Sequence, residues 1–115
     1  MHITVDAAEV ELVSDRLRVG GRFDALLSFG RPVMADWKTG ADLHASHLVA
    51  LAGYAILWEE FNPSRRIEGF LLGRFDRESG DWHAHEWPQL DDAREAFYRA
   101  LDLWYLERAL TKRLR

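Results

Sequence analysis

Two aspartates and a lysine occur at spacings that could support phosphate chemistry. Asp24 closes the segment Gly21–Asp24, and Asp36 and Lys38 follow twelve and fourteen residues later. Paired carboxylates suit Mg²⁺, a hard cation that takes oxygen ligands and keeps several waters. A neighbouring lysine can orient a metal-bound water or neutralise charge that develops on a phosphate. The pattern predicts metal-assisted hydrolysis if the chain brings the three side chains together.

A β-hairpin between Leu17 and Lys38 would bring them together. A three-residue loop at Phe29–Arg31, with Gly30 at a positive φ, makes Asp24 face Asp36 across the two strands. Strand alternation then places Lys38 on the same face as the aspartates.

Carboxylates directly opposite each other lie about 5 Å apart at Cβ and destabilise the sheet, and a divalent cation between them would remove that cost. An alternative of equal weight is a solvated sheet face on which Arg22 and Lys38 offset the acidic pair. The other face of the hairpin is expected to be apolar, with Phe23 opposite Trp37.

The hydrophobic patterns along the chain predict a fold of mixed class, α/β or α+β, with helices on a mixed sheet and the order β-β-β-α-β-β-α. The strand to which Glu9–Val13 belongs carries Val10, Leu12 and, as an alternative, Val13 inward. The last helix is expected to be capped by Asp91 or Asp92. Its predicted inward residues are Phe97, Leu101, Trp104, Leu106 and Leu110. The expected elements are strands over Glu9–Val13, Leu17–Ser28, Val33–Lys38, Ile67–Phe75 and Trp82–Trp87, and helices over Leu43–Phe61 and from Asp91 or Asp92 to about Leu114.

Composition limits the function classes. The 115 residues predict a single domain over 1–115, and the absence of cysteine excludes disulfides, thiolate zinc sites and cysteine nucleophiles. The net charge of −4 argues against a passive nucleic-acid coat, although Arg108–Arg115 is wholly basic among its charged residues. No apolar run is long enough to cross a bilayer and no signal peptide is visible, so we expect a cytoplasmic protein without a membrane partner.

Three segments together resemble one enzyme family. They are Gly21-Arg22-Phe23-Asp24, Asp36-Trp37-Lys38-Thr39-Gly40 and the apolar helix segment Leu48–Ala55. In this order they resemble the RecB-type branch of the PD-(D/E)XK nuclease superfamily, and are similar to phage-encoded RecB-like exonucleases, lambda-type exonucleases and CRISPR adaptation nucleases. The resemblance covers most of the chain and implies a restriction-endonuclease-like core.

The resemblance also implies roles for individual residues. Asp24 and Asp36 match the metal-binding carboxylates, and the main-chain carbonyl of Trp37 matches a third ligand. Lys38 matches the catalytic lysine, and Tyr54 matches a tyrosine that positions the phosphate or the acids. The implied metal is Mg²⁺, with Mn²⁺ as a substitute.

One further acidic ligand is expected from the first strand. Glu9 stands where the phage proteins often place such an acid, fifteen residues before Asp24. Glu11 is the rival, because it alternates onto the same face as Glu9. The sequence does not separate the two.

Two departures from the family pattern bear on activity. Ala50 replaces the glutamine of the helix motif, and only eight residues precede Glu9, where the family core has a first helix. We therefore expect that this helix is absent or supplied by another chain, and that a homo-oligomer or a partner protein covers the surface left open.

The sequence leaves three hypotheses open. The first is a Mg²⁺-dependent DNA nuclease, an exonuclease in phage-type recombination, replication or repair. The second is a weak or inactive module of the same fold that binds DNA or a partner subunit. The third is a structural protein whose acidic pair is incidental.

Histidines give two lesser candidates. His83 and His85 alternate on one strand and could bind a transition metal, although a surface strand is the favoured interpretation. His44 and His47 begin the buried helix and could contact phosphate, although packed or solvated side chains are the favoured interpretation.

Overall fold

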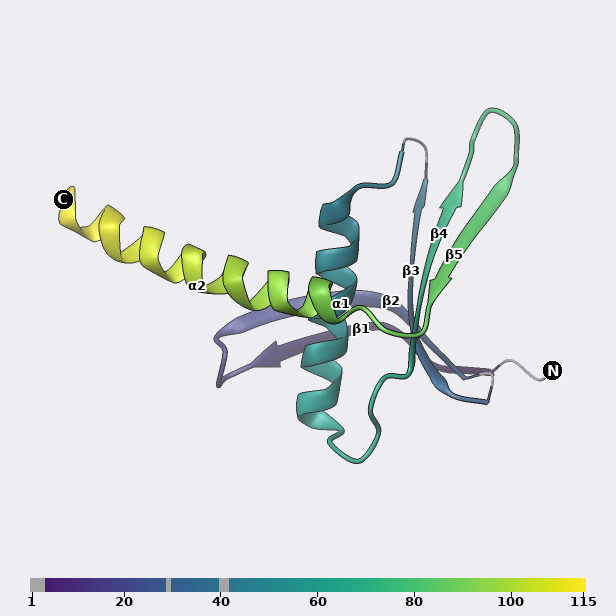
Figure 1. Ribbon diagram of the computed structural model, residues 1–115, viewed down its shortest axis with the longest axis horizontal. Helices are drawn as coiled ribbons and strands as arrows, with labels where there is room; N and C mark the ends of the chain where they lie inside the picture. The colour runs from purple at the N-terminus through teal and green to yellow at the C-terminus, as the bar shows by residue number, and fades with distance from the viewer. Residues whose placement is uncertain (1–3, 29, 40–41) are drawn as a thin grey trace.

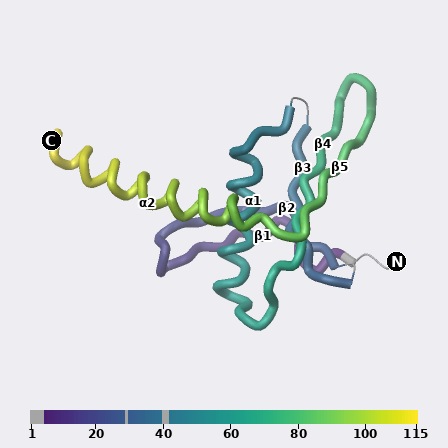
Figure 2. The backbone as a smooth tube through the Cα atoms, in the orientation of Figure 1, coloured from purple at the N-terminus to yellow at the C-terminus, as the bar shows by residue number. Residues whose placement is uncertain are grey.

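Five strands form one mixed sheet, one helix packs on it, and a second helix packs against the first (Figures 1 and 2). The computed structural model describes residues 4–28, 30–39 and 42–115. The elements are β1 (Thr4–Ser14), β2 (Val19–Ser28), β3 (Pro32–Thr39), α1 (Ala45–Phe61), β4 (Gly69–Phe75), β5 (Trp82–Trp87) and α2 (Asp91–Arg113). Spatial order follows chain order, and only β3 and β4 run parallel, joined through α1. The predicted class and element order are confirmed.

The β2–β3 hairpin has the predicted register. Ala25 pairs with Ala35, Leu27 pairs with Val33, and Gly30 in the loop has a φ of +81°. A glycine is favoured at such an angle because it lacks the Cβ that clashes there. Phe29 of the loop and Gly40, the last residue of the Asp36–Gly40 segment, lie outside the described residues.

The first strand is longer than predicted and irregular. The register shifts between Val5 and Ala7, and Glu9 has a φ of +50°. Val10 and Leu12 pack against the core as predicted, whereas the alternative inward residue, Val13, is exposed. Strict alternation explains this result, because Val13 points away from the face that Leu12 shares with Val10.

Helix α1 provides most of the apolar surface that covers the sheet. Its buried residues include Leu51, Ala52 and Ala55, and they share a core with Leu26 and Met34 of the hairpin. Burial of aliphatic surface of this kind contributes roughly 1.5–3 kcal/mol for each large side chain. The core also contains Phe23, Ile67, Phe70, Leu72, Leu90 and Ala93.

Helix α2 begins one residue after buried Leu90, which occupies the cap position without a side-chain cap. The prediction that Asp91 or Asp92 caps this helix is therefore wrong. Both aspartates lie in the first turn, where their charge still suits the helix dipole. Neither helix of the described chain is long and apolar enough to span a membrane.

Only the first half of α2 lies close to α1. A Cβ on Gly53 of α1 would come within 2.6 Å of the Phe97 ring, which shows how closely the two helices approach. The second half extends away from the sheet (Figure 1), and Trp104, Leu106 and Leu110 are exposed there, contrary to prediction. The helix extends beyond α1 and the sheet, so its apolar pattern alone overestimated how much of it is buried.

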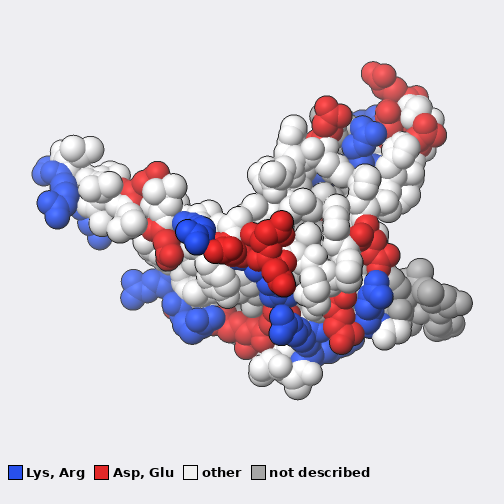
Figure 3. Space-filling view, viewed as in Figure 1, with Lys and Arg blue, Asp and Glu red and all other residues white. Residues whose placement is uncertain are grey.

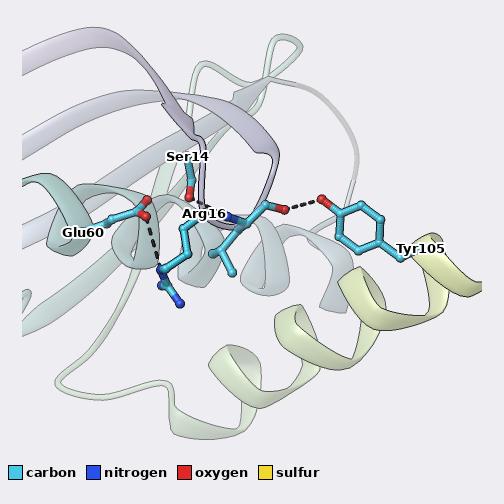
Figure 4. Close-up of polar contacts among 5 residues, drawn as sticks. Ser14, Arg16, Glu60 and Tyr105 are labelled. Carbon is cyan, nitrogen blue, oxygen red and sulfur yellow. Dashed lines mark hydrogen bonds and ion pairs between the residues drawn. The ribbon is translucent and has the colours of Figure 1, made fainter.

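Tyr105 joins the projecting part of α2 to the body. Its hydroxyl donates to the main-chain carbonyl of Leu17 and lies 3.1 Å from that of Arg18, in the β1–β2 turn (Figure 4). The same turn is braced by buried Ser14, whose hydroxyl accepts a 3.0 Å hydrogen bond from the Leu17 N–H. Arg16 adds an ion pair to Glu60 of α1. The turn is thus fixed from both helices.

Candidate active site

The acidic pair lies where β2 and β3 separate. The hydrogen-bonded ladder ends at Ala25 and Ala35, and Asp24 and Asp36 are the next residues on the two strands. Beyond this point the main-chain N–H of Trp37 donates a 3.0 Å hydrogen bond to a carboxylate oxygen of Asp24. A side chain therefore takes over the pairing of a backbone donor, and this contact fixes where the Asp24 carboxylate lies.

Asp36 is the buried member of the pair. Its side chain is 5% exposed, and one of its oxygens lies 3.0 Å from the Lys38 ammonium. Burial, together with a hydrogen bond to Asp24, raises the pKa of Asp36 to about 6, although Lys38 acts in the opposite direction. The hydrogen bond that the Lys38 ammonium donates to Asp36 raises the pKa of Lys38. The three side chains that the sequence predicted to meet do meet.

Tyr54 reaches the same site from α1. Burial raises the pKa of its hydroxyl, and the nearby charge of Asp36 raises it further. Its ring is held close to the sheet by Gly21, where a Cβ would lie 3.1 Å from Tyr54 Cδ1 and from Leu57 Cδ1. The glycine of the Gly21–Asp24 segment thus permits the helix to approach, and this close packing carries Tyr54 to the acids.

Glu9 is not brought into this cluster. Its neighbours Ala8 and Val10 pair with Ala25 and Phe23, so Glu9 lies at the level of Asp24 on the adjacent strand. Its side chain is 76% exposed and forms a 3.8 Å ion pair with Arg22 instead. A role for Glu9 as a metal ligand stays a prediction.

Its rival Glu11 is also exposed and pairs with Arg22 in the β1–β2 register. No three His, Asp or Glu side chains in the described ranges gather closely enough to hold a metal by themselves. Mg²⁺ does not require three, because one or two carboxylates with water and a substrate phosphate suffice. Asp36, buried beside Asp24 and with a raised pKa, fits such a cation, since a positive charge would favour the ionised form of both carboxyls.

Trp37 corrects the predicted apolar face of the hairpin. It is 44% exposed, whereas Phe23 is buried and stacks edge-on against Trp58 of α1. The two aromatic residues no longer face each other because β2 and β3 separate before reaching them.

Trp37 instead lines a surface pocket of about 420 Å³ beside Lys38. His44 and His47, at the start of α1, form another part of its wall, and the N–H of His44 donates to Nδ1 of His47. Burial, then the charge of Lys38, lowers the pKa of His47. Neither aspartate of the pair lines this pocket, but Lys38 both lines it and contacts Asp36, so the pocket offers room for a group held by Lys38.

The remaining candidates lie apart from this cluster. His83 and His85 are exposed on β5, where they pair with Arg74 and Leu72. Ala50, on α1, carries no polar group. Neither histidine gains a described partner that would complete a metal site.

In comparisons with known proteins, no family model and no curated protein matches the chain. The chemistry of the site depends on its own residues. They provide two carboxylates at close range, a cation in contact with one of them, a hydroxyl from the covering helix and an adjacent open pocket. This arrangement can hold a divalent cation and a phosphate together.

Proposed function

We propose that this protein is a Mg²⁺-dependent DNA nuclease of the RecB-like PD-(D/E)XK type, an exonuclease that hydrolyses phosphodiester bonds in phage-type recombination, replication or repair. The observation that supports it most directly is the buried Asp36 next to Asp24 with Lys38 at 3.0 Å. In an exposed pair offset by cations, both carboxyls would be solvated, and burial would not raise the pKa of either one to about 6 as it does for Asp36. Such perturbed groups beside a pocket are typical of active sites.

The proposed metal ligands are Asp24, Asp36 and the carbonyl of Trp37, and Glu9 would join them by leaving its ion pair with Arg22. Mg²⁺, or Mn²⁺ in its place, would lower the pKa of a bound water and offset negative charge on the phosphate. Lys38 orients the attacking water and stabilises charge on the phosphate oxygens from the edge of the pocket. Asp24 remains fixed through its bond to the Trp37 N–H while substrate enters.

Tyr54 is proposed as a positioning residue. Its hydroxyl, with a pKa raised above its usual range, stays protonated at neutral pH and can donate to a carboxylate or a phosphate oxygen. The side chain is packed between α1 and Gly21, so its direction is set before substrate binds.

A second candidate is a module of the same fold that binds DNA or a partner without cleaving it. Ala50 favours this candidate, because the helix motif that the chain resembles carries a glutamine there. The contact between Lys38 and Asp36 favours the enzyme.

The deciding experiment compares cleavage of a linear 3′- or 5′-labelled DNA duplex by wild-type protein, Asp36→Asn and Lys38→Ala, each with Mg²⁺ and with EDTA. The nuclease proposal expects Mg²⁺-dependent shortening by the wild type and loss of about a hundredfold or more in both variants. Arg66→Gln serves as a control, since Arg66 is exposed and far in sequence from these residues. Equal background cleavage by all four proteins would reject the enzyme in favour of the binding module.

We further propose that two copies of the chain associate through α2. Its projecting half carries a stripe of leucines at helical spacing, each more than half exposed: Leu103, Leu106, Leu110 and Leu114. An antiparallel pair of α2 helices would cover both stripes, while Arg108 and Lys112 of the same helix face the β1–β2 turn instead.

A further inference from the structure

A basic notch lies between the β1–β2 turn and the second half of α2. It has a volume of about 480 Å³, and its wall includes Arg18 from the turn and Arg108, Lys112 and Arg113 from the helix. Blue side chains gather at the C-terminal end of α2 and at the turn below it in Figure 3. Among the described residues, those that line the notch include no Asp or Glu.

These four cations differ from most others in the chain. Most arginines elsewhere pair with acids, as Arg16 does with Glu60 and Arg99 with Glu95. Arg66, Arg74 and Arg77 are exceptions that lie apart from the notch and do not cluster with one another in its wall. Within the described ranges, none of the four cations of the notch forms an ion pair with Asp or Glu. In a protein with a net charge of −4, this concentration of uncompensated positive charge is unusual. An anion would gain several favourable contacts there at once.

The notch is held in shape by groups that carry no charge. Tyr105 ties the carbonyls of the turn to α2, and Arg18 within that turn has a φ of +54°. The Arg108 guanidinium lies 4.7 Å from the centre of the Trp104 ring, which restricts its position on the outer side. The cations are therefore placed on two elements whose separation is fixed.

We infer that this notch binds the phosphate backbone of the DNA duplex, separately from the acidic pair. Arg18 precedes Asp24 by six residues of β2, which is about 20 Å at the rise of a strand. Uncompensated Lys and Arg on one face are the footprint of backbone binding without sequence preference. The identity of the ligand as DNA rests on the proposed function, whereas the anion site rests on the notch alone.

The test is binding of a fluorescein-labelled 20-base-pair duplex, followed by anisotropy in EDTA so that no cleavage occurs. Arg18→Gln and Arg113→Gln each remove a cation of the notch, and Arg66→Gln removes an equally unpaired exposed cation elsewhere. Each notch variant should bind several-fold more weakly, with the slope of log affinity against log salt shallower by about 0.9. The Arg66→Gln protein should bind like the wild type.

Tyr105→Phe provides a second variant without a change of charge. It removes the hydroxyl that ties the turn to α2, so Arg18 loses its fixed place and the affinity should fall, while the thermal transition of the protein stays cooperative. If both arginine variants bind as the Arg66→Gln control does, the notch is not a DNA site. That result leaves cleavage by the wild type, and hence the proposed function, untouched. Weaker binding by the notch variants together with no cleavage by the wild type would reject the nuclease and keep the notch.

Discussion

The main-chain N–H of Trp37 donates a 3.0 Å hydrogen bond to the carboxylate of Asp24, across the point at which β2 and β3 part. This contact fixes one carboxylate oxygen of Asp24, beside the hydrogen bond that Asp24 shares with Asp36. It also explains how two like charges persist next to each other, since one carboxylate is held by a backbone donor and the other by Lys38.

Asp36→Asn should not destabilise the protein in the absence of metal. The pKa of Asp36 is raised, so its ionised form is disfavoured in the folded state, and asparagine removes that cost while its amide can donate to Asp24. In EDTA the variant should melt at the wild-type temperature or above. In Mg²⁺ the wild type should gain stability by mass action and the variant should not. A variant that melts well below the wild type in EDTA would mark the pair as structural.

Lys38→Ala should separate metal binding from chemistry. The carboxylates remain, so Mg²⁺ should still raise the melting temperature, whereas cleavage should be lost. Loss of Lys38 also removes the charge that lowers the pKa of Asp36, so the metal-free variant should hold its proton to a higher pH. A pH titration of the Asp36 carboxyl by NMR measures this shift. An unchanged titration would contradict the contact.

Stability of the metal-free protein should fall as pH rises from about 4 to about 6. Between the unfolded pKa of Asp36, 3.8, and the folded value of about 6, the folded state holds a proton that the unfolded state has released. The loss should total at most about 3 kcal/mol, at 1.36 kcal/mol for each unit of pKa difference. Urea unfolding in EDTA at several pH values measures it, and the Asp36→Asn protein should show no such decrease.

Tyr54→Phe should lower cleavage by about tenfold or more and leave the fold intact. The ring that packs beside Gly21 is kept, and only the hydroxyl is removed. Tyr98→Phe is the matched control, because Tyr98 is exposed on α2. Equal activity of the two variants would show that the Tyr54 hydroxyl does not contribute.

Self-association should depend on the leucine stripe of α2. Leu106→Lys should shift a sedimenting dimer to a monomer at micromolar concentration without lowering the melting temperature of the monomer, because Leu106 is 62% exposed. Ala100→Lys is a control on an exposed position of the same helix outside the four leucines. A wild-type protein that sediments as a monomer throughout this range would contradict the proposal.

The hairpin and the acidic pair were predictable because they depend on local rules. A three-residue loop with glycine sets the register, and alternation then decides which residues face each other. The exposure of the Trp37 side chain was not predictable in the same way. Its exposure follows from the separation of β2 and β3, which depends on how β3 pairs with β4 and packs against α1.

The predicted burial of α2 was wrong for a related reason. The pattern of apolar residues in Leu101–Leu114 is that of a packed helix, but a pattern carries no information on how far the opposing surface extends. A raised pKa for one of the two paired acids was predictable in direction, whereas its assignment to Asp36 follows from burial and required the structure. The notch depends on a long-range contact of Tyr105 with the β1–β2 turn, for which the sequence has no signal beyond the basic helix end.

The hairpin that carries the acids also affects how the chain folds. Its strands are joined by a three-residue loop, whereas β3 and β4 are separated in the chain by the whole of α1 and can pair only after that helix has folded back. Local pairings form early in folding and non-local pairings late. The pairing of β2 with β3 early in folding therefore brings Asp24 and Asp36 together, and their repulsion slows this step. Refolding of the metal-free chain should become faster as the solution is acidified toward pH 4, where one of the acids is neutral. Stopped-flow refolding of the wild type against Asp36→Asn, which lacks the repulsion, would measure that acceleration.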